Sequence, residues 1–503
     1  MNSVQGFADT GPDYPAEEDS MRVDRRQFME SAAIGLGGMV LASQGEAAHS
    51  RQDPMQSEKP NLIYIFADQW RGQACGYTGD SNARTPNLDQ LAHESLVFSN
   101  CISGCPVCSP YRASLLSGQY WLTHGHFMND LAFNPELDTF GKVLNREGYE
   151  TAYIGKWHLD GHGRSAFIPR ERRQGFKYWK VLECTHDYNH SFYYADDPEK
   201  RLWDGYDALA QSRDAVDYMK NREKGKPFAL FLSWGPPHDP YQTAPEQYRK
   251  LYEDRDRIVL PPNVPPEKQT EAREMLAGYY AHIAALDACL GDILTAVKDL
   301  GLEDNTLLVF TSDHGDLLGS HGQKNKQQPY EESILVPMVL RFPALFGRQK
   351  REVKTLINTP DLMPTLLGLC GIASPEGVEG TDFSEDLKSG KDRLIDGALI
   401  MCAAPFGQWQ RSMGGREYRG IRTERYTYVR DLKGPWLLFD NQADPFQKKN
   451  LAGMAEYRSL RDQLEEKLRG LLGQTRDSFE PADQLLARWG YQVDETGTIP
   501  YKN

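Results

Sequence analysis

A cysteine, a proline and an arginine stand at fixed spacing in the segment Cys108-Ser109-Pro110-Tyr111-Arg112. Proline suits the first turn of a helix, where its missing N–H is not needed. Cys108 would then lie at a helix N-terminus, where free N–H groups and the helix dipole favour anions. Arg112, one turn further on, would add a positive charge on the same face. The segment predicts an anion-binding site around a cysteine, with a buried structural cysteine as the alternative.

Oxygen-bearing side chains follow two apolar runs. Asp68-Gln69 ends the run over 61–67, and Asp313-His314 ends the run over 307–311. Carboxylate and amide oxygens delivered from separate strands would suit Ca²⁺, or Mg²⁺ or Mn²⁺. Either pair alone could equally cap a turn. The metal site is therefore predicted from the two pairs together.

Lysine and histidine stand in three further polar segments. These are Gly155-Lys156-Trp157-His158, Pro236-Pro237-His238-Asp239 and Gln323-Lys324-Asn325-Lys326. A histidine titrates near neutral pH and suits proton transfer, whereas a lysine can neutralise a bound anion. Taken one at a time, these residues are more simply solvated or packed side chains. Their assignment therefore depends on the other motifs.

Taken together, the motifs resemble those of the type I sulfatases of the alkaline phosphatase superfamily. The family signature is Cys-x-Pro-x-Arg followed by Ala or Ser residues and Thr-Gly, and this chain carries Ser117 in place of the threonine. The second signature, Gly-Tyr-x-Thr followed by Gly-Lys-Trp-His, is similar to residues 148–158. The similar segments stand in family order between about residues 59 and 453, so coincidence is a poor explanation.

The resemblance implies hydrolysis of sulfate esters by a nucleophile made from cysteine. In this family a maturation enzyme oxidises the cysteine to formylglycine, an aldehyde whose hydrate attacks sulfur. The arginine holds this side chain, two lysines bind the sulfate, one histidine manages the protons of the nucleophile and another protonates the leaving group. Lys326 is preferred to Lys324 because it stands four residues before Tyr330, as the family's lysine stands before its aromatic residue. The implied catalytic residues are Cys108, Arg112, Lys156, His158, His238 and Lys326.

The resemblance also implies a bound divalent metal ion. Gln69 stands where the family commonly has a second acid, and a neutral amide lowers the charge of the metal cage. The identity of the metal stays open, with Ca²⁺ favoured over Mg²⁺ or Mn²⁺. The implied ligands are Asp68, Gln69, Cys108 in its modified form, Asp313 and His314.

Two other functions stay open. Gln69 also occurs in the related phosphonate monoester hydrolases, so a phosphonate or phosphate ester hydrolase of the same superfamily is one alternative. A catalytically dead, glycan-binding homologue is another, although the complete set of cysteine, arginine and histidines argues against it. The expected substrate is a sulfated small molecule or oligosaccharide. Loops over 170–204 and 406–409 would recognise it, and their aromatic residues could stack on sugars or simply pack beneath the loops.

Three apolar runs must position these residues. Those over 61–67, 228–233 and 307–311 are typical of buried strands in a parallel sheet. Ligands bind at the carboxyl ends of such strands, so we expect a single site where all three end. Helices are expected over 88–96, 109–116 and 276–300.

The expected architecture is α/β, with a large mixed, mostly parallel central sheet flanked by helices, similar to alkaline phosphatase. Residues 58–385 would form the sulfatase catalytic domain, and residues 386–503 a smaller C-terminal α+β subdomain. In that subdomain we expect antiparallel strands over 418–429 and 436–440 around a turn at 433–435. A charged helix over 455–472 should follow.

Residues 1–57 are expected to be an export signal and a disordered leader. Arg25-Arg26 precedes a small-residue, apolar run over 32–42 and a small-residue stretch over 45–48, a pattern typical of a twin-arginine signal. The run is shorter than the ~20 residues of a membrane span, so no stable membrane insertion is expected. The protein would be periplasmic or secreted.

Composition restricts the partners. The formal net charge of −14 should repel nucleic acid, which is not an expected partner. Eight cysteines in 503 residues are too few for a disulfide scaffold. An anionic substrate therefore requires a local cluster of lysine, arginine, histidine or metal that reverses the field in one cleft.

Overall fold

The computed structural model describes residues 59–500 of the 503-residue chain. These residues belong to one compact unit. The predicted export signal and leader, residues 1–57, lie outside the described residues. The helices are α1 (Pro86–His93), α2 (Cys108–Ser117), α3 (Phe140–Arg146), α4 (Asp207–Asn221), α5 (Glu246–Arg249), α6 (Gln269–Asp299), α7 (Glu331–Ile334), α8 (Pro343–Phe346), α9 (Leu362–Leu369), α10 (Ser384–Ser389), α11 (Arg458–Gln474) and α12 (Ala482–Trp489).

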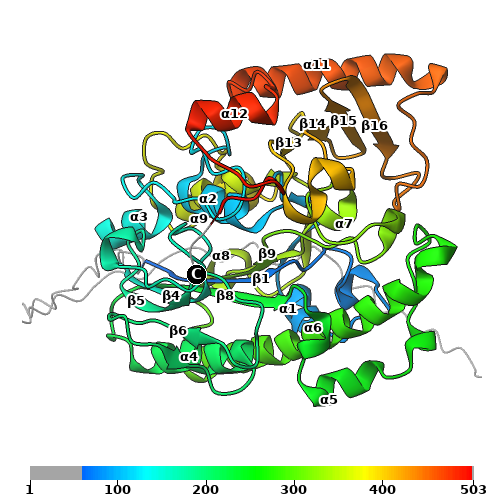
Figure 1. Ribbon diagram of the computed structural model, residues 1–503. Coiled ribbons are helices and arrows are strands. Elements are labelled where there is room, and N and C mark those ends of the chain that lie inside the picture. The colour runs from blue at the N-terminus through cyan, green and yellow to red at the C-terminus, as the bar shows by residue number, and fades with distance from the viewer. Residues whose placement is uncertain (1–58, 501–503) are drawn as a thin grey trace, which may run out of the picture. The chain divides into compact units, whose positions relative to one another are not determined.

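A large mixed sheet lies at the centre of the fold (Figure 1). Its strand order is β11 (Arg351–Val353), β2 (Leu96–Phe98), β10 (Met338–Arg341), β9 (Thr306–Ser312), β1 (Asn61–Asp68), β8 (Phe228–Pro237), β4 (Glu150–Lys156) and β5 (Tyr178–Leu182). Among these strands β10 alone runs antiparallel to its neighbours. The other pairings are parallel, which confirms the predicted α/β architecture.

Both faces of the sheet are covered, which is why its central strands are continuously apolar. Ile63 and Ile65 of β1 belong to the hydrophobic core that includes α4 and α6. Tyr64 and Phe66 point to the opposite face and belong to the core that includes α2 and α9. Figure 1 shows these two layers of helices on either side of the sheet.

The strand order brings three polar strand ends to one edge. β1 lies between β8 and β9, and the register pairs Ala67 with Ser312 and Asp68 with Pro237. His238 and Asp313 directly follow the partner strands, so they emerge beside Asp68. The predicted convergence of these three strand ends is confirmed.

Gly155 allows β4 to approach β8 closely. Its φ of 104° lies in a region that favours glycine, and a Cβ there would stand 2.0 Å from the carbonyl oxygen of Ser233. The glycine therefore lets the strand bring Lys156 to the same edge of the sheet.

A second, antiparallel sheet follows in the chain. Its order is β13 (Ala398–Cys402), β14 (Tyr418–Arg422), β15 (Tyr426–Asp431) and β16 (Gly434–Asp440), and α11 lies across it (Figure 1). Two short pairs complete the strands: β3 (Cys101–Ile102) with β12 (Ile357–Asn358), and β6 (Phe192–Tyr193) with β7 (Arg201–Leu202). The second sheet begins after the expected domain boundary at residue 385, which stays a prediction.

Some predicted boundaries were wrong. The strand expected over 418–429 is a hairpin, since the backbone N–H of Thr423 donates to the carbonyl of Tyr426 at 2.8 Å and closes a turn. The turn expected at 433–435 lies earlier, because β16 already begins at Gly434. The helix expected over 88–96 ends at His93, and Leu96 opens β2.

The long helix α6 begins seven residues before its predicted start at residue 276. By length and composition the helical stretch Pro266–Asp299 could cross a membrane, but 72% of its most apolar window is buried inside the protein. Packing against the central sheet and α4 accounts for this apolar surface.

Candidate active site

Cys108 is the first residue of α2. The preceding Val107 is extended, with φ −147° and ψ 143°, so the helix begins at the cysteine. The backbone N–H of Ser109 donates to the Asn129 side chain at 3.1 Å. Gly118 ends the helix with φ 65°, a left-handed conformation that glycine adopts at little cost. The Cys-x-Pro-x-Arg segment therefore forms the predicted helix start.

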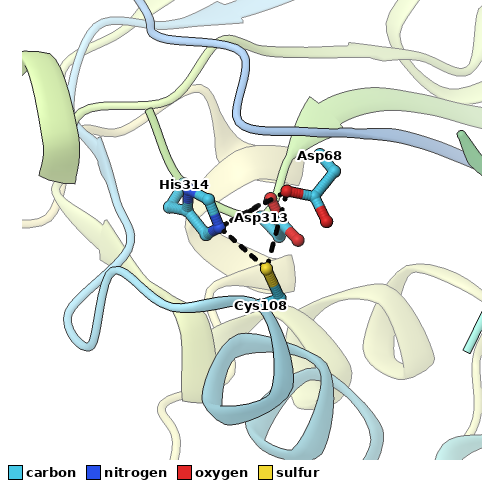
Figure 2. Close-up of side chains that lie close together, drawn as sticks. All are labelled: Asp68, Cys108, Asp313 and His314. Atoms are coloured by element: carbon cyan, nitrogen blue, oxygen red, sulfur yellow. Dashed lines mark hydrogen bonds and ion pairs between the residues drawn. The ribbon is translucent and has the colours of Figure 1, made fainter. Parts of the chain in front are cut away.

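Four buried side chains meet at the edge of the sheet (Figure 2). The ligand atoms of Asp68, Cys108, Asp313 and His314 all lie within 4.8 Å of one another. Cys108 Sγ lies 3.3 Å from His314 Nε2 and 3.6 Å from Asp68 Oδ1. His314 Nδ1 contacts the carbonyl of Gly315 at 3.0 Å, which turns Nε2 toward the cluster.

This cluster fits one divalent cation. Burial, and then the nearby charge of Asp68, raise the pKa of Asp313, because two buried carboxylates repel each other. A cation between them would relieve that repulsion, and two carboxylates with an imidazole are suitable ligands for a divalent metal.

Gln69 is held beside the cluster. Its backbone N–H donates to Asp313 Oδ1 at 3.0 Å. Its side-chain oxygen accepts from Lys326 at 2.8 Å, and its amide nitrogen donates to Asp316 at 2.6 Å. The amide oxygen is thereby turned toward the lysine, and the role of Gln69 as a metal ligand stays a prediction.

Arg112 and Lys156 neutralise the buried carboxylates. The Arg112 guanidinium lies 3.1 Å from Asp313 and 3.4 Å from Asp68, and donates to Ser233 Oγ at 2.7 Å. Lys156 Nζ lies 2.6 Å from Asp68 Oδ2 and 3.8 Å from Cys108 Sγ. Two buried acids are thus matched by two buried cations.

Lys326 reaches the site, whereas Lys324 does not. Lys326 Nζ lies 3.3 Å from Cys108 Sγ and 2.7 Å from His238 Nε2. Lys324 pairs instead with Glu271 at the surface, at 3.2 Å. The loop between β9 and α7 therefore brings the lysine that was preferred from the sequence to the cysteine.

His238 is fixed on two further sides. Its Nδ1 contacts the carbonyl of Asp239 at 2.9 Å, and its ring stacks on that of His186 with centroids 4.6 Å apart. Burial, and then the charge of Lys326, hold the pKa of His238 well below its usual range. The neutral ring can therefore accept a hydrogen bond from Lys326 Nζ at Nε2.

The field around the cysteine is positive. Burial and the charge of Asp68 would raise the pKa of the Cys108 thiol, but Lys156, Lys326 and His314 outweigh them and hold it well below its usual range. The chain as a whole carries a charge of −14. The local cluster that an anionic substrate requires is therefore present at this edge of the sheet.

A pocket of about 200 Å³ opens onto the cluster, and among the predicted site residues its lining includes Gln69, Cys108, Lys156, His158, His238 and Lys326. The predicted recognition loops contribute His186, Phe406, Gly407 and Gln408 to its walls. The aromatic side chains Trp179, Tyr188, Tyr194 and Trp203 are buried and pack beneath the loops instead. Further wall residues outside these loops are Asn129, Arg164, Asp239, Asn325 and Thr498.

His158 lies in the same pocket and contacts Asp130, a residue that the sequence analysis did not single out. Its Nε2 lies 3.2 Å from Asp130 Oδ1. Burial opposes its charge, but Cys184, Asp130 and Cys108 raise the pKa of His158 to about 10.

The sequence analysis also missed other residues at the site, and only some of them stand in a sequence pattern that could have indicated them. Asp316 could have been found, because it stands three residues after Asp313 in the strand-end motif. Asn129, Arg164 and His186 stand in no local pattern, and only the tertiary structure places them at the pocket.

A mixed, mostly parallel sheet with a charged cluster at its carboxyl edge is the arrangement of the alkaline-phosphatase-like hydrolases. A solved structure described under the metabolism of multiple glycosaminoglycans by Bacteroides thetaiotaomicron superimposes with a TM-score of 0.77 at 31% identity, covering 86% of this chain and 99% of that chain.

Sequence comparisons agree with the fold. The family profile described as Sulfatase matches residues 60–372, and one described as N-sulphoglucosamine sulphohydrolase, C-terminal, matches residues 319–474. The chain is 44% identical to an ulvan-active sulfatase of Formosa agariphila, over 88% of this chain and 87% of that protein. It is 33% identical to an endo-4-O-sulfatase of Bacteroides thetaiotaomicron, over 91% and 100%. The chain belongs to the sulfatase family and is a sulfuric ester hydrolase.

Lys326→Ala should lower kcat/KM for a sulfate ester by about 10²- to 10³-fold, the range for removing one group that stabilises transition-state charge. Lys324→Ala is the matched control: it removes the same charge two residues away, and activity should stay within about twofold because its pair is exposed. Steady-state kinetics with 4-nitrophenyl sulfate measure both variants. Equal losses in the two would contradict the placement of Lys326 as the sulfate-binding lysine.

Proposed function

We propose that this enzyme removes sulfate from a sulfated carbohydrate, with a formylglycine made from Cys108 as the nucleophile. The observation that carries the proposal is the surroundings of Cys108 Sγ, with Lys326 at 3.3 Å, His314 at 3.3 Å and Lys156 at 3.8 Å. Two relatives above 30% identity, an ulvan-active sulfatase and an endo-4-O-sulfatase, support the substrate class.

Formylglycine at residue 108 would supply a hydrated aldehyde, the nucleophile toward the sulfur of the ester. Lys156 and Lys326 neutralise the sulfate oxygens and stabilise the charge that develops during transfer. Arg112 holds both carboxylates of the cluster and so fixes the start of α2 against the sheet.

Two histidines move protons at named atoms. Lys326 Nζ and His238 Nε2 lie 2.7 Å apart, and this pair together holds the proton that is given to the leaving oxygen of the substrate. His158 lines the same pocket as residue 108 and, in its neutral form, would take up the proton of the remaining hydroxyl group, as the bond between the other oxygen and carbon breaks and sulfate leaves. One nitrogen of each ring is held by the protein: His238 Nδ1 lies 2.9 Å from the carbonyl of Asp239, and His158 Nε2 lies 3.2 Å from Asp130 Oδ1.

We propose that Asp68, Asp313 and His314, with residue 108 and Gln69, hold a divalent metal, with Ca²⁺ favoured. The ion would supply a fixed positive charge that polarises the sulfate group. We also propose export by the twin-arginine route to the periplasm or outside the cell, on the strength of Arg25-Arg26 and the apolar run that follows.

Cys108→Ala should abolish turnover, because it removes the nucleophile. Peptide mass spectrometry of the parent protein should find residue 108 about 18 Da lighter than cysteine, as the thiol-to-aldehyde conversion requires. Cys105→Ala is the matched control, since Cys105 is an equally buried cysteine three residues away and outside the cluster. A fully active parent protein with an unmodified Cys108 would overturn the proposal.

Removal of the metal by a chelator should lower kcat by about a hundredfold or more, because the metal stabilises charge in the transition state. Metal analysis of the treated protein checks that the removal is complete. Ca²⁺ should restore activity better than Mg²⁺ or Mn²⁺. Full activity in protein shown to contain no metal would refute the metal assignment.

A panel of substrates separates the proposal from phosphonate ester hydrolysis, which Gln69 favours. Sulfated oligosaccharides should release sulfate with a higher kcat/KM than 4-nitrophenyl sulfate. A nitrophenyl phosphonate ester should be at least about a hundredfold poorer, because the charge and geometry of its transition state differ. A preference for the phosphonate would favour the alternative.

A further inference from the structure

The side chains of Arg164, Asp130 and His158 are linked by hydrogen bonds, and Arg164 and His158 line the pocket. The Arg164 guanidinium grips Asp130 with two bonds, Nε to Oδ1 at 3.0 Å and a terminal nitrogen to Oδ2 at 2.8 Å. Asp130 Oδ1 lies 3.2 Å from His158 Nε2. The Asp130 side chain is 3% exposed and that of Arg164 is 26% exposed. The two parallel hydrogen bonds fix the orientation of the Asp130 carboxylate relative to Arg164 more firmly than one hydrogen bond would.

The backbone of His158 is equally constrained. Its φ of 59° is unusual for a residue with a side chain, and its N–H donates to the carbonyl of Glu183 at 2.8 Å. The Glu183 carboxylate accepts from the backbone N–H groups of Leu159, Asp160 and Gly161, at 3.3, 2.7 and 3.1 Å. Strained backbone is kept where surrounding contacts hold it, commonly at functional sites.

The other ring nitrogen of His158 is open to the reaction. Nδ1 is buried and has no hydrogen-bond partner among the described residues. Cys108 and His158 line the same pocket, and the Cys108 side chain is one of the groups that raise the pKa of the His158 ring. With Nε2 engaged by Asp130, Nδ1 is the atom that can exchange a proton with residue 108.

We propose that Asp130, clamped by Arg164, is a positioning residue that fixes the His158 ring with Nε2–H toward the carboxylate and Nδ1 toward residue 108. The inference rests on the proposed function of His158. A carboxylate behind an imidazole selects the nitrogen that carries the proton and stabilises the ring when both nitrogens are protonated. Without it, the ring could turn and present either nitrogen to the pocket.

The same fold contains a matched control for this arrangement. Arg172 grips Asp160 with two bonds at 2.7 and 3.1 Å, and Asp160 lies 3.2 Å from His162 Nδ1. The exposed fractions are similar, 29% for Arg172 and 1% for Asp160. His162, however, is 51% exposed, and none of the three lines the pocket.

The kinetic experiment compares Asp130→Asn and Arg164→Gln with Asp160→Asn and Arg172→Gln in the full-length enzyme. Asp130→Asn should lower kcat for 4-nitrophenyl sulfate by about a hundredfold with KM within about twofold, because proton transfer and not binding is impaired. Arg164→Gln should lower kcat by about tenfold, since the carboxylate stays but is less well fixed. Both control variants should keep kcat within about threefold, because Asp160 and Arg172 do not line the pocket.

A second measurement does not depend on turnover. In Cys108→Ala protein labelled with ¹⁵N-histidine, the His158 ring signals, assigned from their loss in His158→Gln, should shift in Asp130→Asn and stay unchanged in Asp160→Asn. Unchanged ring signals and unchanged kcat in Asp130→Asn would overturn the inference. If Cys108→Ala itself retains activity, the proposed function fails instead, so the two failures are distinguishable.

Discussion

Two acidic side chains and three lysine or arginine side chains are buried together at the carboxyl edge of the central sheet, and the site depends on their mutual neutralisation. They are Asp68, Asp313, Arg112, Lys156 and Lys326. Each charge alone would cost several kcal/mol to remove from water, and the cost is recovered only when opposite charges and hydrogen bonds meet it. The cluster can therefore form only when strands β1, β4 and β9, helix α2 and the loop before α7 are all in place.

This constraint explains how an acidic protein handles an anionic substrate. The long-range field of a chain with a charge of −14 repels anions. Within the pocket, the nearest charges to Cys108 Sγ include two lysines, and burial weakens screening by solvent. The local arrangement of charges, and not the net charge, decides which ligand binds there.

The residues proposed for catalysis and those proposed to recognise the substrate lie on different parts of the fold. The groups around Cys108 Sγ come from strand ends, from the first turns of α2 and, in the case of Lys326, from the loop before α7. The outer walls come from loops, including Phe406, Gly407 and Gln408 after β13 and Thr498 near the end of the described chain. The Gly407 N–H donates to the carbonyl of Thr496 at 3.0 Å, so the two walls support each other. Loops can change without disturbing the buried charges, which is how one site plan can serve different sulfated substrates.

The sequence by itself determined the α/β class, the three buried strands and the helix that starts at Cys108, because each depends on local apolar periodicity and on proline and glycine placement. It also indicated which polar residues end those strands. The resemblance already favoured Lys326 over Lys324, and the structure places Lys326 Nζ 3.3 Å from Cys108 Sγ. The tertiary structure alone decided that most loop aromatics are packed and that the segment 418–429 folds back as a hairpin. It also brought Asp130 and Arg164 to His158. The contacts of Asp130 join residues that stand apart in the chain, 28 residues in the case of His158 and 34 in the case of Arg164, and depend on the course of the loops, for which no short stretch of sequence carries a signal.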